Sequence, residues 1–140
     1  MQLPELFGDY FKQLLSAEGQ SPEARTVEWF GWLIMLEGSI FLFAPRLAES
    51  ILHLPALSDQ AANYLRLAGL LVGGVGMLYV VSGRLNAQAF VFASLLDRPL
   101  VPFIMAGLWY LGLIPWQLAV AFSVQDFGSF LWTFLTWKAT

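Results

Sequence analysis

Hydrophobic residues form four long runs along the chain, and polar residues gather between them. The runs extend over Val27 to Ala44, Ala61 to Ser82, Phe90 to Leu113 and Trp116 to Trp137. A helix of about 20 residues crosses the roughly 30 Å hydrocarbon core of a bilayer, so each run is long enough to span it. Backbone amides need partners in hydrocarbon, and a barrel would require more and shorter segments. The pattern predicts an all-α integral membrane protein, a four-helix bundle.

Helix breakers fall between these runs. Pro45 follows the first run, Pro55 lies in the next loop, Gly83 and Asn86 follow the second run, and Pro115 separates the last two. The last connection is very short, so the third and fourth helices should form an antiparallel hairpin. The simplest arrangement is an up-down-up-down bundle.

The chain before the first run has the pattern of an amphipathic helix. Its apolar residues share one helical face and its polar residues fall elsewhere; the apolar set is Leu6, Phe7, Tyr10, Phe11, Leu14 and Leu15. We therefore expect residues 1–26 to lie at the membrane surface and residues 27–140 to form the transmembrane domain. Surface-bound helices are usually rich in Lys and Arg, and this one is not, so lipid headgroups and a partner protein both stay open as its docking surface.

A second apolar stripe lies in the first loop. It consists of Leu47, Ile51 and Leu54, after Pro45, and it is too short to span a bilayer.

Composition supports the membrane assignment and excludes several function classes. Of 140 residues, 58% are hydrophobic and 12% are charged, against about 25% charged in an average soluble domain. The net charge of -3 and the absence of a basic patch argue against nucleic-acid binding. The chain has no cysteine, which rules out disulfides, thiolate metal sites and cysteine nucleophiles. The expected partners are the lipid bilayer and another membrane protein or a second copy of the chain.

Positive charges near the span ends predict the orientation in the membrane. Lys12, Arg25, Arg84 and Lys138 collect on one side, and Arg46 and Arg66 on the other. The positive-inside rule therefore places both termini in the cytoplasm.

Five ionisable residues stand inside the apolar runs and are the candidate site residues: Glu37, Arg66, Asp97, Arg98 and Asp126. A charge near the bilayer centre costs several kcal/mol, so each should face the bundle interior, a partner or water. Asp126 is the most deeply placed, near the middle of the fourth run. We expect Glu37 and Arg66 to pair across the first two helices as a structural tie.

Arg98 is the predicted partner of Asp126. Counted from the turn at Pro115, Arg98 lies about 17 residues back and Asp126 about 11 residues forward, which is an axial offset of roughly 9 Å. A long arginine side chain could reach across most of that distance. A structural ion pair that fixes the register of the last two helices is the favoured interpretation, and a proton or ion relay or a polar ligand pocket is the alternative.

The motif Asp97-Arg98-Pro99, with Pro102 close behind, interrupts the third run. Proline removes an amide donor and disfavours helix in the preceding residue, so this run should be kinked or split. A broken helix at membrane depth is typical of some transporters. The simpler interpretation is that Asp97 and Arg98 mark the water interface.

Glycines in the second run predict close helix packing. Gly69, Gly73, Gly74 and Gly76 contain one GxxxG spacing and lie within an apolar run, not at a phosphate-binding turn. His53 is the only histidine, so no HExxH motif or bis-histidine haem site is present. We therefore expect no catalytic residue, no metal and no cofactor.

Over Tyr64 to Lys138 the sequence resembles small uncharacterised bacterial four-span membrane proteins. The shared features are Arg66-Leu67-Ala68-Gly69 opening a glycine-rich helix, a polar break holding Arg98, an aromatic third span, and Asp126 followed by Phe130-Leu131-Trp132. The resemblance implies a four-helix fold and a bacterial inner membrane location, and it implies no reaction.

These features together favour a non-catalytic accessory subunit that stabilises or regulates a larger membrane protein or complex. A small bundle that binds a lipid or another hydrophobic ligand, with Asp126 and Arg98 as polar anchors, is the first alternative. A channel or proton-coupled carrier is the second.

Overall fold

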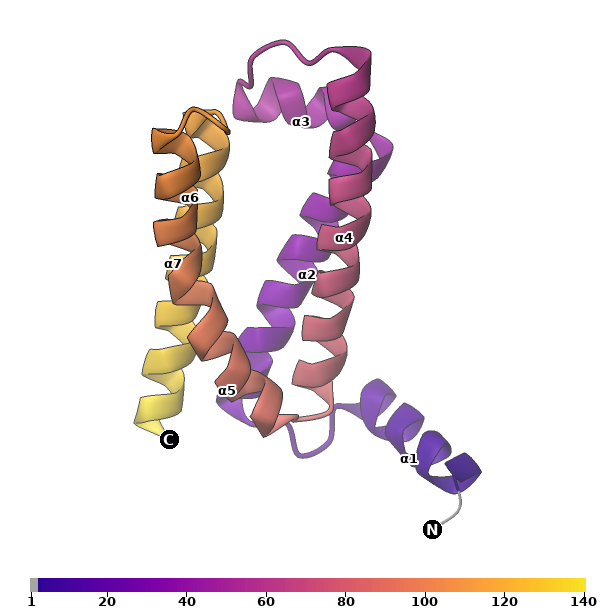
Figure 1. Cartoon of the computed structure of the whole chain (residues 1–140). Helices are drawn as coiled ribbons and strands as arrows, with labels where there is room; N and C mark the ends of the chain where they lie inside the picture. The colour runs from indigo at the N-terminus through magenta and orange to yellow at the C-terminus, as the bar shows by residue number, and fades with distance from the viewer. Residues whose placement is uncertain (1–2) are drawn as a thin grey trace.

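The computed structural model describes residues 3–140, and every regular element in this range is a helix (Figure 1). The helices are α1 (Leu3–Ser16), α2 (Pro22–Phe43), α3 (Pro45–Leu52), α4 (Asp59–Arg84), α5 (Gln88–Asp97), the 3₁₀ turn η1 (Arg98–Leu100), α6 (Val101–Tyr110) and α7 (Trp116–Ala139). Four helical segments are long and apolar enough to cross a membrane: α2, α4, the combined α5–η1–α6 segment, and α7. The predicted all-α membrane architecture is confirmed. Residues 1 and 2 of the predicted N-terminal segment lie outside the described range.

Serine caps explain why two spans begin before their apolar runs. The Ser21 hydroxyl accepts a hydrogen bond from Ala24 N at 3.2 Å, and Pro22 occupies the first helical position of α2. The Ser58 hydroxyl accepts from Ala61 N at 3.1 Å and starts α4 in the same way. These side chains satisfy amides that have no partner within the helix, so the helical backbone extends beyond the apolar residues.

The third span is split, as the prolines predict. α5 ends at Asp97, η1 covers the proline-containing Arg98–Leu100 segment, and α6 begins at Val101. Pro99 and Pro102 have no amide hydrogen, so the helical hydrogen bonds cannot continue without interruption. Figure 1 shows that the chain changes direction between α5 and α6.

The spans form two helical hairpins. α2 packs along α4, α6 packs along α7, and α5 crosses one end between them. Figure 1 shows both termini at this end, which we call the terminal end; the opposite end, which carries α3, we call the α3 end. The hairpin between the last two spans is confirmed, and Gly112 in its turn has a φ of 71°, a conformation that glycine adopts readily.

Glycines bring the backbones of α2 and α4 into direct contact. A Cβ atom added to Gly76 would lie 2.6 Å from Met35 N and 2.9 Å from Gly31 O. A Cβ added to Gly69 would lie 2.6 Å from Gly38 O, and one added to Gly83 would lie 2.7 Å from Ala24 O. Real Cβ atoms do not approach other atoms this closely. Any larger residue would therefore force the two helices apart.

The α4 glycines that meet α2 include the GxxxG pair and continue at intervals of seven residues. Gly69, Gly76 and Gly83 face α2, whereas a Cβ added to Gly73 or Gly74 would meet nothing within 4 Å. The prediction of close packing is confirmed, because a Cβ added to Gly38 of α2 would meet the backbone of both Gly69 and Gly73, the two glycines of the GxxxG spacing. The further contacts at Gly76 and Gly83 continue at seven-residue intervals, which keep one face of a helix against a partner that crosses at a small angle.

A pair of alanine substitutions in α4 tests this packing. Gly76→Ala should lower the free energy of unfolding by about 1 to 3 kcal/mol, because the new methyl group overpacks the backbone contact. Gly74→Ala, two residues away, is the control and should be neutral or slightly stabilising, because alanine has the higher helix propensity. Equal effects of the two substitutions on unfolding by sodium dodecyl sulfate, followed by circular dichroism, would contradict the model of backbone contact.

Candidate functional site

Near the terminal end a buried core joins α5 to the α2–α4 hairpin. There Phe30 and Tyr79 pack edge to face with ring centroids 5.1 Å apart, within a core that also includes Val27 and Val91. Farther along the bundle the packing between the hairpins is incomplete, and three cavities are found along them. Three of the five candidate polar residues line the first two cavities: Glu37, Asp97 and Asp126.

A pair of buried threonines closes the terminal end. The hydroxyls of Thr26 on α2 and Thr133 on α7 are 2.7 Å apart, and Thr26 also donates to the Glu23 carbonyl oxygen at 2.7 Å. Both threonines are buried. This polar contact joins α7 to α2.

Glu37 lies in an apolar cavity of about 220 Å³ between α2, α3 and α7. Its walls are almost entirely hydrophobic, and Ile40, Ile51 and Phe122 are among them. The Glu37 Oε1 atom is buried and makes no hydrogen bond with the described residues. A carboxylate oxygen held in this way loses hydration without gaining a partner.

Asp126 lines a second cavity of about 220 Å³, which shares Phe122 with the first. The Gln125 side chain lies beside both Asp126 and Glu37, and the two carboxylates are close enough for their charges to interact. Asp97 lines the same second cavity from the end of α5. The structure therefore brings Glu37, Asp97 and Asp126 to the space between the hairpins.

Arg98 is fully buried beside this space. Its Nε donates to the Ser94 carbonyl oxygen at 3.2 Å and its Nη2 to the Ser94 hydroxyl at 2.9 Å. Its guanidinium carbon lies 5.2 Å from the centre of the Phe30 ring and 5.9 Å from that of Tyr79, within the range of a cation–π interaction. Nη1 makes no hydrogen bond with the described residues.

The two predicted ion pairs are wrong. Among residues 3–140, Arg98 and Asp126 form no ion pair within 4.0 Å, because the guanidinium is bound to Ser94 one helical turn away. Arg66 does not reach Glu37 either; it is exposed and donates to the Leu42 carbonyl oxygen at 2.8 Å. Both arginines bind backbone or hydroxyl groups instead, which for Arg98 leaves Nη1 without a hydrogen bond among the described residues.

Sequence reasoning missed the residues that hold Arg98. Ser94 precedes Arg98 by four positions, a spacing that places both on one helical face, and this signal was available in the sequence. Tyr79 and Phe30 come from other helices, and no local pattern relates them to Arg98. The contacts of Thr26 and Thr133, and those of Glu28 and Arg84, depend in the same way on tertiary packing.

The site is rich in negative charge and has apolar walls. It holds the carboxyl groups of Glu37, Asp97 and Asp126 against the single guanidinium of Arg98. No group of three or more potential metal-binding side chains of the His, Cys, Asp or Glu type is found within residues 3–140. This arrangement is suited to holding a proton or a positively charged group in a hydrophobic setting.

Comparisons with protein-family models, curated proteins and solved structures found no match for this chain.

Removing the Ser94 hydroxyl tests how Arg98 is held. Ser94→Ala should lower the free energy of unfolding by about 1 to 3 kcal/mol, because it leaves a buried charged donor without its acceptor. Ser39→Ala is the control. The Ser39 hydroxyl also donates to a carbonyl oxygen of its own helix, Met35 O at 2.7 Å, but Ser39 is exposed. Its removal should change the free energy of unfolding by no more than about 0.5 kcal/mol. Thermal unfolding in detergent measures both, and equal losses would refute the assigned role of Ser94.

Proposed function

We propose that this protein binds a hydrophobic molecule with a positively charged group in the space between its two helical hairpins. The observation that carries the proposal is the buried Glu37 Oε1, which lacks a hydrogen-bond partner in an apolar cavity next to a second carboxylate. The Glu37 and Asp126 carboxylates would bind the charged group, and the apolar walls would bind the hydrophobic part.

The charge of the ligand follows from the charges around the cavities. Three carboxylates face one guanidinium, so fully ionised side chains leave two negative charges in excess. Each uncompensated charge within the bilayer costs several kcal/mol. One positively charged ligand group compensates one of these two charges, and an anionic group would add a third.

The shape of the space favours a slender ligand. The two cavities that contain carboxyl groups are each about 220 Å³, below the roughly 300 to 1,000 Å³ of pockets for drug-sized molecules. A larger groove of about 870 Å³ lies at the α3 end between the start of α4 and the turn before α7. A single alkyl chain fits this arrangement better than a bulky ring system.

Two amphiphiles of equal chain length and opposite charge test the proposal. The protein in phosphatidylcholine nanodiscs should bind decyltrimethylammonium and exclude decanoate in equilibrium dialysis, after subtraction of uptake by empty nanodiscs. Glu37→Gln and Asp126→Asn should each weaken binding of the cation about tenfold or more, equivalent to about 1.4 kcal/mol. Glu18→Gln is the matched control for loss of one negative charge, because Glu18 is exposed and lines neither of the two cavities that contain carboxyl groups.

The outcomes distinguish an error in the proposed charge of the ligand from an error in the proposed binding function. Stronger binding of decanoate would overturn the assigned charge and make Arg98 the anchor. Binding of neither amphiphile above the empty-nanodisc level would overturn the binding function itself. Thermal unfolding of each variant shows whether a loss of binding reflects a loss of fold.

We further propose that the protein resides in a bacterial inner membrane with both termini in the cytoplasm. Lys12, Arg25, Arg84 and Lys138 belong to helices or helix ends at the terminal end, while Arg46 lies on α3 at the other. This asymmetry supports the orientation through the positive-inside rule.

Cysteine labelling tests the orientation, because the chain contains no native cysteine. In intact cells, Ser16→Cys and Ala139→Cys should be shielded from an impermeant maleimide, and Ser58→Cys should react. Labelling of Ser16→Cys from outside, with Ser58→Cys protected, would reverse the assigned topology. Labelling of all three after membrane disruption is the control for reagent access.

The accessory-subunit role and the carrier role stay predictions. An accessory subunit should retain another protein after mild extraction, whereas a ligand-binding bundle should retain a small molecule. Native mass spectrometry of the extracted protein distinguishes the two. A carrier would in addition have to release its ligand on both sides of the bilayer, which transport into proteoliposomes would measure.

A further inference from the structure

The helix α1 has one apolar face and one polar face along its whole length. Leu3, Phe7, Phe11 and Leu15 recur every four residues and are largely exposed, with exposed fractions of 82%, 65%, 49% and 79%. Phe7 and Phe11 pack against each other with ring centroids 4.9 Å apart. Such an exposed apolar strip is unfavourable in water and indicates a surface that covers it.

The rest of the bundle does not cover this strip. No residue of α1 is buried, and its contacts with the bundle are confined to its C-terminal part. Figure 1 shows α1 projecting outward from the terminal end, away from the hairpins. No part of residues 3–140 therefore covers the apolar face.

The Arg84 side chain fixes the position of α1. Its Nε donates to the Leu14 carbonyl oxygen at 2.6 Å and its Nη2 to the Leu15 carbonyl oxygen at 3.1 Å, which satisfies the C-terminal end of α1. The same guanidinium forms an ion pair with the buried Glu28 at 3.2 Å. Because Arg84 ends α4, this bond network holds α1 at the level where a span leaves the hydrocarbon.

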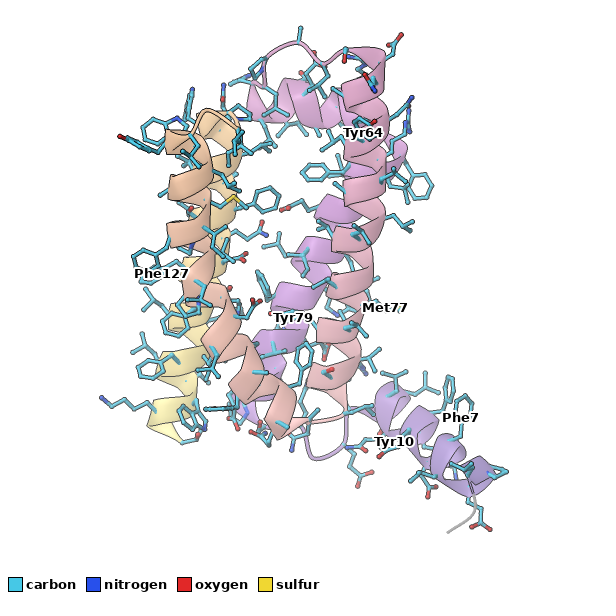
Figure 2. All side chains as sticks on the ribbon, viewed as in Figure 1. Phe7, Tyr10, Tyr64, Met77, Tyr79 and Phe127 are labelled. Carbon is cyan, nitrogen blue, oxygen red and sulfur yellow. The ribbon has the colours of Figure 1, made fainter. Side chains whose placement is uncertain are left out.

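The apolar strip lies on the membrane side of α1. Figure 2 shows Phe7 on the upper side of α1, which is the direction in which the spans extend from the terminal end. The lipid-facing surface of α4 carries Met77 and Leu78, both about half exposed, close to its end at Arg84. The apolar surface of α1 is therefore a continuation of the surface that the spans present to lipid.

We propose that α1 is an interfacial anchor whose apolar face inserts into the bilayer beside the bundle, and that uncharged headgroups suffice for this insertion. The polar face of α1 carries Glu5, Asp9 and Lys12, so it has one more negative than positive charge. Anionic lipid consequently offers no attraction, and burial of apolar area drives the binding.

Nitroxide labels on the full-length protein in phosphatidylcholine nanodiscs test the anchor. The absence of native cysteine allows single-site labelling. For each label we compare its accessibility to oxygen, which concentrates in lipid, with its accessibility to a nickel chelate. The ratio of oxygen to nickel-chelate accessibility should be severalfold higher at Phe7→Cys and Phe11→Cys than at Asp9→Cys and Lys12→Cys. Ratios that are equal at all four positions would overturn the proposal.

Lipid composition and label–label distances complete the test. Adding phosphatidylglycerol should leave the ratios unchanged, and an increase at Phe7→Cys would overturn the role of uncharged headgroups. A sharp distance between Phe11→Cys labels on two copies in one nanodisc would overturn the lipid assignment in favour of a second chain. Its absence, together with the accessibility pattern, supports lipid as the occupant.

Discussion

Close backbone contact between α2 and α4 is the constraint on which the rest of the structure depends. Transmembrane helices gain little from hydrophobic burial against each other, because lipid is equally apolar, so they rely on close packing. Gly31, Gly38, Gly69 and Gly76 supply that packing by leaving no side chain between the two backbones. The α2–α4 hairpin is consequently the most closely packed pair of spans in the bundle.

The second hairpin cannot pack in the same way. α6 and α7 carry large side chains, among them Phe122, and α7 reaches α2 mainly through Thr133 and these bulky residues. The split at Pro99 lets α5 close the terminal end while α6 follows a different direction. The incomplete packing between the hairpins is therefore a direct consequence of a tight first hairpin and a broken third span.

The polar residues of the spans divide into two groups with different partners. Arg98, Ser94, Thr26 and Thr133 are buried and hydrogen-bonded to one another or to backbone, so they act in packing. Glu37 and Asp126 face cavities, and Glu37 Oε1 has no partner among the described residues. Groups of the second kind are costly in a membrane unless something binds them, which is why the proposed ligand site centres on them.

The sequence alone determined the helical class, the number of spans, the break at Pro99 and the two faces of α1, because each depends on residues near one another along the chain. Only the tertiary structure decided the partners of the charged residues and the seven-residue glycine contact. The predicted pairs of Arg98 with Asp126 and of Glu37 with Arg66 considered axial distance alone. Which side chains meet also depends on the rotation of each helix about its axis, and backbone contact between α2 and α4 sets that rotation.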